Sequence, residues 1–171
     1  MSKIYTKQGD GGYSTLYDGN KYYKNNIIFD VLGDFDELNS HIGLLITNCI
    51  KRDYKDEIEI LRKIQSKIMI LATYIAELKN QKHQVYIYSS DIQFLEKNID
   101  QYSEKNPIIV GFTLIGKNVT ESQTHVCRSI TRRVERSIYK LNYKIDYNIK
   151  MFLNRLSDFF FILAIKFGND Y

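Results

Sequence analysis

Hydrophobic residues recur along most of the chain in steps of three and four, which places them on one face of a helix. The pattern is clearest over residues 53–78, where the apolar stripe consists of Ile58, Leu61, Ile64, Ile68, Leu71, Ile75 and Leu78. A second stripe, which predicts a helix over residues 29–49, consists of Val31, Leu38, Ile42 and Leu45. Stripes of this kind are typical of helices that pack against helical neighbours.

Three further helices are expected in the second half of the chain. One spans residues 89–102 and begins at a Ser-Ser-Asp sequence suited to an N-cap. The next spans 120–142, and residues 120–123 fit a capping box. Its apolar stripe consists of Val126, Ile130, Val134, Ile138 and Leu141. The last spans 146–167, and Gly168 is expected to cap its C-terminal end.

This order of elements predicts an all-α, five-helix bundle, because strands do not alternate with helices. The 171 residues have the usual size of one domain, so residues 1–171 are expected to form a single domain. With only nine Gly and one Pro, the chain has too few turns for a many-stranded sandwich or barrel. Residues 1–26 are polar and aperiodic, and we expect a loop or tail there, followed by the bundle over residues 27–171.

Charge and cysteine content exclude several classes of function. The formal net charge of +4 comes from interspersed residues, 24 basic and 20 acidic, and does not indicate nucleic acid binding. No apolar run approaches the roughly 18 residues of a membrane span, and no leader segment is evident. The two cysteines, Cys49 and Cys127, cannot form a disulfide framework, which favours a reducing compartment and a cytoplasmic location.

A glycine-rich segment near the N-terminus is a candidate anion site. It reads Thr6-Lys7-Gln8-Gly9-Asp10-Gly11-Gly12-Tyr13-Ser14-Thr15. Glycines permit positive φ angles, which can turn successive backbone amides toward one anion. Lys7 and Lys24 add positive charge, and Ser14 and Thr15 add hydroxyl donors. The pattern fits a solvated glycine-rich tail equally well.

Two further constellations lie on the last two predicted helices. Arg128, Arg132 and Arg136 recur at every fourth position, opposite the apolar stripe. Their mutual repulsion favours an anion or an acidic partner there, with a solvated basic face as the alternative. Asn154 and Asp158 lie one turn apart within an apolar aromatic run. A buried Asn needs hydrogen-bond partners, so Asn154 either specifies the core or recognises a ligand.

Residues 111–118 nearly match the phosphate-loop pattern G-x-x-x-x-G-K-[ST], and residues 27–30 resemble its acidic partner strand. Asn118 stands where that motif needs a hydroxyl for Mg²⁺, and no parallel sheet is expected. No metal site is expected either, because metal-ligand spacing is lacking among His41, His83 and His125.

Four motifs, taken in order, resemble the PduO-type ATP:cob(I)alamin adenosyltransferases, also called corrinoid adenosyltransferases. They lie at residues 4–15, 33–40, 125–136 and 152–158, so the likeness covers essentially the whole chain. The resemblance implies transfer of the 5′-deoxyadenosyl group of ATP to cob(I)alamin, with formation of adenosylcobalamin and release of triphosphate. It also implies Mg²⁺, a reductase that delivers Co(I), and a homotrimer of five-helix bundles with active sites between adjacent subunits.

The resemblance further assigns roles to individual residues. The implied ATP contacts are Thr6, Lys7, Gln8, Gly9, Ser14, Thr15, Lys24, Arg132, Arg133, Val134, Glu135, Arg136 and Asn154. Arg132 is implied to grip the polyphosphate, and Phe112 to block the lower face of the cobalt, which eases its reduction. Asp36 and Arg128 are implied to bridge subunits.

The chain departs from the family pattern at several places, which include a short connecting loop before Phe152. Gly11 stands where the family commonly has Lys, Ile165 stands where it often has Arg, and residues 112–116 lack the usual Pro-Gly turn. Two alternatives stay open from the residues themselves. One is an ATPase built around Lys117, and the other is a helical nucleotide-binding or scaffold protein without transferase activity.

Overall fold

The computed structural model describes residues 4–17, 19–79, 86–106 and 114–170. Its helices are α1 (Ile27–Lys51), α2 (Lys55–Ala76), α3 (Ser89–Lys105), α4 (Val119–Ile138) and α5 (Tyr147–Asn169). The predicted five-helix bundle is confirmed, with one correction. Strands β1 (Tyr13–Thr15) and β2 (Lys21–Tyr23) form a small antiparallel hairpin within the segment that we expected to be aperiodic. Strands of three residues are too short to produce a readable alternation of polar and apolar positions.

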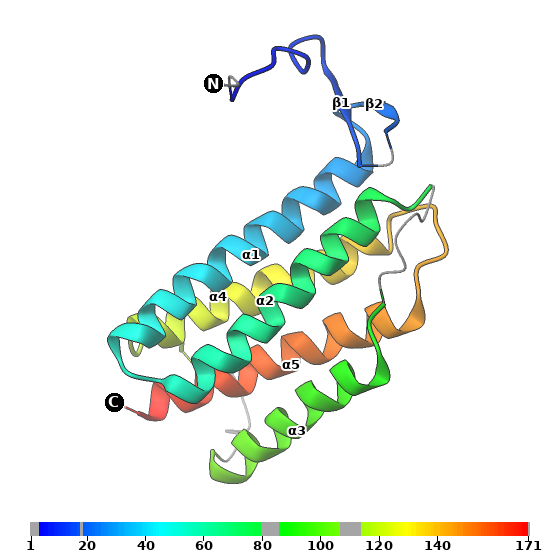
Figure 1. Ribbon diagram of the computed structural model, residues 1–171. Coiled ribbons are helices and arrows are strands. Elements are labelled where there is room, and N and C mark those ends of the chain that lie inside the picture. Colours follow the sequence, from blue (N-terminus) through cyan, green and yellow to red (C-terminus); the bar gives the residue numbers. More distant parts are fainter. Residues whose placement is uncertain (1–3, 18, 80–85, 107–113, 171) are drawn as a thin grey trace.

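Helices α1, α4 and α5 form the middle of the bundle, while α2 packs on α1 and α3 packs on α5 (Figure 1). The stripe predicted for α1 is fully buried, and so is that of α2 apart from the half-buried Ile58 at its start. Helix α5 supplies an aromatic layer to the same core, made of Phe152, Phe159, Phe160 and Phe167. Burial of this shared apolar surface is what holds the helices together.

Helix α4 differs from expectation at both ends. It begins at Val119 because the Asn118 side chain accepts a 2.9 Å hydrogen bond from the backbone amide of Glu121. The expected capping box at Thr120 is therefore wrong, since Thr120 lies inside the helix. The helix ends at Ile138, four residues before the expected end at 142, and Val126 of the predicted stripe is exposed.

The remaining helix ends also show where local signals mislead. Gly168 does not cap α5, because the helix continues through Asn169 and Gly168 lies buried in its last turn. The start expected for α3 is confirmed at Ser89, although the N-cap is Tyr88, whose backbone amide donates a 2.9 Å hydrogen bond to Asp91.

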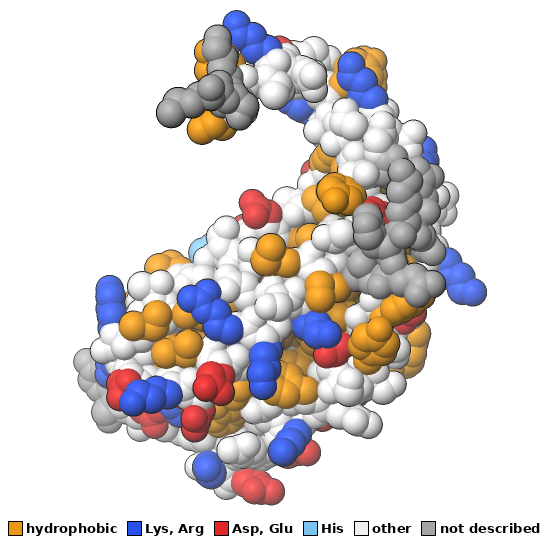
Figure 2. Space-filling model, viewed as in Figure 1, with side chains coloured by type: hydrophobic (Ala, Val, Ile, Leu, Met, Phe, Trp, Pro, Cys, Tyr) orange, Lys and Arg blue, Asp and Glu red, His pale blue; other side chains and the backbone are white. Residues whose placement is uncertain are grey.

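The N-terminal segment stands beyond the end of α1, clear of the bundle (Figure 1). Its strands pack chiefly on each other. The hairpin is tethered to the bundle by buried Leu16 and by Tyr22, whose ring centroid lies 4.8 Å from Lys79 Nζ. Figure 2 shows an open hollow between this projecting segment and the body of the molecule. None of the helices in the described parts of the chain is long and apolar enough to span a membrane.

Candidate functional site

The N-terminal loop encloses a groove of about 550 Å³. Its lining consists of Thr6, Gln8, Gly9, Tyr13, Ser14, Thr15 and Lys21. Two consecutive turns shape the loop, since the Asp10 amide donates to the Lys7 carbonyl and the Gly12 amide donates to the Gly9 carbonyl, both at 3.3 Å. Among the loop glycines only Gly12 has a positive φ, while Lys7 adopts φ 59°. Five of the predicted ATP contacts thus lie around one groove.

Two lysines bring positive charge to this loop. Lys24 Nζ approaches Gly9 so closely that a Cβ built on Gly9 would lie 3.1 Å from it. Lys21, which the sequence analysis missed, lines the groove because β2 pairs Lys21 with Thr15. Only the pairing of the two strands reveals its place, and neither strand was predicted. Lysine ammonium groups and hydroxyl donors around one groove suit a polyphosphate.

The arginines of α4 differ in their environments. Arg132 and Arg136 are exposed, and neither has a hydrogen-bond or ion-pair partner among the residues that the structure describes. Arg128 is half-buried, and its buried Nε has no hydrogen-bond partner in the part of the chain that the structure describes. Two free guanidinium groups, one helical turn apart, leave a basic surface available to an anion.

Arg133, by contrast, is engaged within the chain. Its Nε donates a 2.8 Å hydrogen bond to Asp34 Oδ1, and its Nη2 pairs with Glu37. Ser137 Oγ donates to the other oxygen of Asp34 at 2.5 Å. Asp34 and Glu37 were missed as partners, although both belong to the α1 motif at residues 33–40. Arg133 therefore ties α4 to α1, and its ATP contact stays a prediction.

Asn154 lies exposed on α5, so the interpretation of this residue as a core device is wrong. Its Nδ2 donates to Glu135 Oε1 at 3.2 Å, and its Oδ1 accepts from Arg155 Nη1 at 2.9 Å. Arg155 Nε in turn donates to Glu96 Oε1 of α3 at 3.0 Å. Asp158 is exposed as well. The amide of Asn154 is thus held in a fixed orientation at the surface, next to a carboxylate of α4.

A second groove, of about 540 Å³, follows the outer side of α4. Apolar Ile115 and Val126 line it toward the start of the helix, and Arg133 and Arg136 line it near the helix end. Glu37 lines the groove as well and pairs with Arg133. The groove therefore offers apolar contact at one end and, at the other, the positive charge of Arg136, which has no ion-pair partner among the described residues. His125 also lines it, and burial is the main cause that lowers the pKa of this imidazole.

The phosphate-loop interpretation of residues 111–118 is wrong. The amides of Gly116 and Lys117 donate to Glu121 Oε2 at 3.0 and 3.2 Å, so a carboxylate occupies the place of a phosphate. Within the described residues the only sheet is the hairpin, and no parallel sheet accompanies the motif. Phe112 lies outside the described residues, and its expected place below the cobalt stays a prediction.

The described ranges contain possible metal ligands as well as the two cysteines. Groups of three or more His, Cys, Asp or Glu side chains that could hold a metal ion are not found in them. Both Cys49 and Cys127 are free and buried, and burial raises the pKa of each thiol to about 12. Such thiols stay protonated and are poor nucleophiles.

The fold and the two grooves define a helical-bundle protein suited to an extended anion that also carries an apolar part. The model of one family, described as cobalamin adenosyltransferase, matches residues 4–167. The chain therefore belongs to the cobalamin adenosyltransferase family.

Individual relatives agree with this assignment. The chain is 34% identical to the cobalamin adenosyltransferase of Cupriavidus metallidurans, over 96% of this chain and 87% of the relative. It is 32% identical to the corrinoid adenosyltransferase MMAB of Bos taurus, over 99% of this chain and 74% of the relative. A variant of the PduO-type ATP:corrinoid adenosyltransferase from Lactobacillus reuteri, solved with cobalamin and ATP, superimposes with a TM-score of 0.90. That comparison has 32% identity and covers 98% of this chain and 94% of the other.

Proposed function

We propose that this chain transfers the 5′-deoxyadenosyl group of ATP to the cobalt of cob(I)alamin. The observation that carries the proposal is the groove along α4, which is apolar near Ile115 and Val126 and basic near Arg136. A corrinoid presents a broad, largely apolar macrocycle, and the triphosphate of ATP is a compact polyanion. The apolar end of this groove therefore suits the corrinoid, and the separate N-terminal groove suits the triphosphate, in the family whose members carry out this reaction.

The reaction requires little acid–base chemistry from the protein. Co(I) attacks C5′ of ATP, a cobalt–carbon bond forms, and the C5′–oxygen bond breaks. The bonding electron pair leaves with the triphosphate. The protein has to align the two reactants and stabilise the charge that develops on the leaving group. We assign this second task to Arg132 and to Lys7 of the N-terminal loop, two exposed cations that have no ion-pair partner among the described residues.

We assign the ATP phosphates to the N-terminal groove, with Thr6, Ser14 and Thr15 as hydroxyl donors. Asn154 and Glu135 would recognise the nucleoside, because their hydrogen bond orients both groups at the surface. Mg²⁺ would be held mainly by the phosphates of ATP.

We further propose a homotrimer in which two chains complete each site. The N-terminal loop projects away from its own bundle (Figure 1), which leaves it accessible to a neighbouring subunit. Arg128 supports the same idea, since its buried Nε has no hydrogen-bond partner among the described residues and Asp36 is exposed on α1. A carboxylate of the adjacent subunit would satisfy that donor, whose isolation is otherwise costly.

An anaerobic assay tests the proposed function. Chemically reduced cob(I)alamin is mixed with ATP and Mg²⁺, and the loss of the Co(I) absorbance is followed. We expect a light-sensitive alkylcobalamin from the wild type and a loss of rate of about 10²- to 10³-fold in Arg132→Ala. Arg62→Ala, which removes an exposed arginine of α2, is the matched control. A folded wild-type protein that binds ATP without consuming cob(I)alamin would favour the nucleotide-binding or scaffold alternative.

Light scattering of the purified chain tests the assembly. We expect a trimer for the wild type, and dissociation for Asp36→Arg and for Arg128→Asp, because each leaves like charges opposed. The double charge swap should restore the trimer. A monomeric wild type at micromolar concentration would overturn this part of the proposal. A reductase partner and a cytoplasmic location remain predictions.

A further inference from the structure

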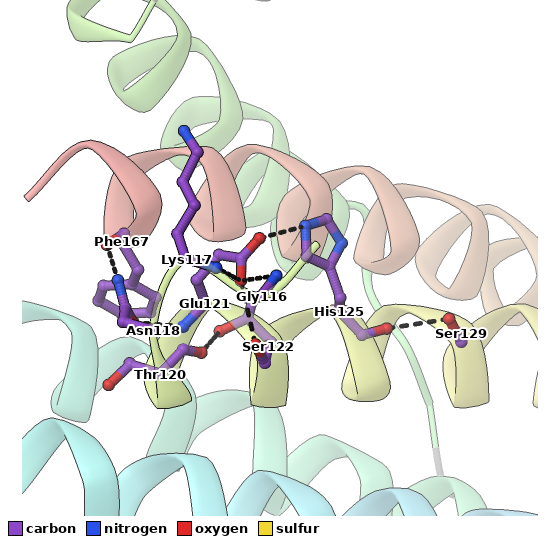
Figure 3. Close-up of polar contacts among 10 residues, drawn as sticks. Gly116, Lys117, Asn118, Thr120, Glu121, Ser122, His125, Ser129 and Phe167 are labelled. Atoms are coloured by element: carbon purple, nitrogen blue, oxygen red, sulfur yellow. Dashed lines mark hydrogen bonds and ion pairs between the residues drawn. The ribbon is translucent and has the colours of Figure 1, made fainter. Parts of the chain in front are cut away.

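Glu121 on α4 is a nearly buried carboxylate with an unusual number of donors. Its side chain is only 4% exposed. One oxygen accepts from the amides of Gly116 and Lys117 and from Ser122 Oγ, at 3.0, 3.2 and 3.1 Å. The other lies 3.3 Å from His125 Nε2 (Figure 3). Burial of a carboxylate is costly without such partners, so this arrangement offsets a substantial penalty.

The hydrogen bonds of Glu121 are not needed to cap the helix. Asn118 already fulfils that task, since its Oδ1 accepts from the Glu121 amide. In a standard capping box the third residue of the helix would accept from the amide of the N-cap itself. Glu121 instead reaches one and two residues further back, to Lys117 and Gly116. It therefore orders the segment that precedes α4.

The same segment is seated on the last turn of α5. Asn118 Nδ2 donates a 2.8 Å hydrogen bond to the Phe167 carbonyl (Figure 3). Gly168 permits the close approach, because a Cβ there would lie 3.1 Å from Lys117 Cδ and 3.4 Å from Glu121 Cγ. Residues 116–118 are thus fixed from two sides, by α4 and by α5.

Two exposed apolar side chains directly precede this fixed segment. Leu114 is 92% exposed and Ile115 is 55% exposed, immediately before the residues that Glu121 holds. Ile115 also lines the apolar end of the groove along α4, together with Val126. Neighbouring apolar side chains that are exposed at a groove indicate a contact surface.

We propose that Glu121 is a positioning residue for corrinoid recognition. It acts through the amides of Gly116 and Lys117, and it fixes Leu114 and Ile115 where they meet the apolar surface of the corrinoid. This inference rests on the proposed adenosyltransferase function. Glu121 itself touches no reacting atom, so its loss affects the binding of one substrate and leaves the other unaffected.

Steady-state kinetics with each substrate varied in turn test this role. We expect Glu121→Ala to raise the KM for cob(I)alamin about tenfold or more, since small misplacements of a binding segment are costly. The KM for ATP should stay within about twofold of the wild type, because Glu121 has no contact with the N-terminal groove. Glu121→Gln keeps an acceptor oxygen for the two amides, so its KM for cob(I)alamin should stay close to the wild-type value. Glu104→Ala, which removes an exposed carboxylate of α3 away from both grooves, is the matched control and should leave both KM values unchanged.

The outcomes separate this inference from the function on which it rests. Wild-type protein that does not adenosylate cob(I)alamin would contradict the proposed function. The positioning role would be overturned if the wild type is active and Glu121→Ala either raises both KM values equally or raises neither. If Glu121→Ala does not fold, the double variant Leu114→Ser with Ile115→Ser provides the test. Both side chains are exposed, so this variant leaves the core intact, and it should raise the KM for cob(I)alamin. An unchanged corrinoid KM in that variant would likewise overturn the inference.

Discussion

Arg133 of α4 lies within hydrogen-bonding distance of Asp34 of α1, with Nε and Oδ1 2.8 Å apart. The adjacent Arg132 has no partner among the described residues and is exposed. Two consecutive arginines in one motif therefore serve different purposes, because successive positions of a helix point about 100° apart. Arg133 holds two helices together, and Arg132 is free to bind an anion.

Replacement of Arg133 should weaken the fold more than replacement of Arg132. Because Arg133 is 42% exposed, solvent screens its ion pairs, and we expect Arg133→Ala to lower the free energy of unfolding by only about 1 kcal/mol. Arg132→Ala should change it by less than about 0.5 kcal/mol. Urea unfolding of both variants measures the difference. Equal stability of the two variants would show that the pairing of Arg133 with α1 contributes nothing.

A partly buried ion pair and a hydrogen bond, both made by Glu57, join three helices at the opposite end of the bundle from the hairpin. Glu57 Oε1 of α2 accepts from Tyr102 Oη of α3 at 2.9 Å and lies 3.2 Å from Lys166 Nζ of α5. We expect Lys166→Met to destabilise the protein by about 3–5 kcal/mol, because it leaves the carboxylate of Glu57 buried without its ion-pair partner. Urea unfolding checks this value.

The double variant Lys166→Met with Glu57→Gln controls for the lost packing of the lysine. It should recover a large part of the stability, since the second change removes the stranded charge. If it is no more stable than Lys166→Met alone, the loss comes from packing and not from the unpaired charge.

The helices that were predicted best are those whose buried face is purely apolar. Val31, Leu38 and Ile42 of α1 are all fully buried, as their spacing indicates. Periodicity reports burial directly in such helices, because every third or fourth position faces the same neighbour.

Helix α4 was predicted less well because its buried face is partly polar. Thr124 and Thr131 are fully buried, and their hydroxyls donate to the carbonyls of Thr120 and Cys127 in the preceding turn. A hydroxyl that is satisfied within its own helix can be buried, but a sequence pattern counts it as polar. The expected stripe therefore included Val126, which is exposed.

The site was predicted at the level of motifs but not of contacts. The loop at residues 6–15 forms a groove, and Arg132 and Arg136 form an exposed basic face, while their contacts with ATP stay predictions. The pairing of Arg133 with Asp34 joins residues that are 99 positions apart, and local sequence spacing does not predict such a contact. Glu121 was read only as part of a capping sequence, because the approach of α5 to residues 116–118 depends on tertiary packing.

The two cysteines should be unreactive in the folded protein. Burial raises the pKa of Cys49 and of Cys127 to about 12, so the thiolate that reacts with alkylating agents is scarce at neutral pH. We expect no modification by iodoacetamide in native buffer and modification of both thiols in urea. Mass spectrometry counts the adducts. Rapid labelling of either cysteine in native buffer would contradict the packing described for α1 and α4.

Stability should fall as the pH is lowered through the titration of His125. Burial is the main cause that lowers the pKa of this histidine; Arg128 also lowers it, and Glu121 opposes the shift. The unfolded chain, with an ordinary pKa of about 6.5, therefore binds a proton before the folded chain does. The stabilisation is complete above that value and decreases progressively below it.

Unfolding free energies between about pH 7.5 and pH 5.5 test this dependence. We expect His125→Gln to show a shallower decline than the wild type, because the group that titrates differently in the two states has been removed. His41→Gln controls for the loss of a histidine from another half-buried position. An identical decline in wild type and His125→Gln would mean that other groups govern the acid sensitivity. If the contribution of His125 to the free energy of unfolding instead increased as the pH is lowered, Glu121 would outweigh burial and raise the pKa of His125.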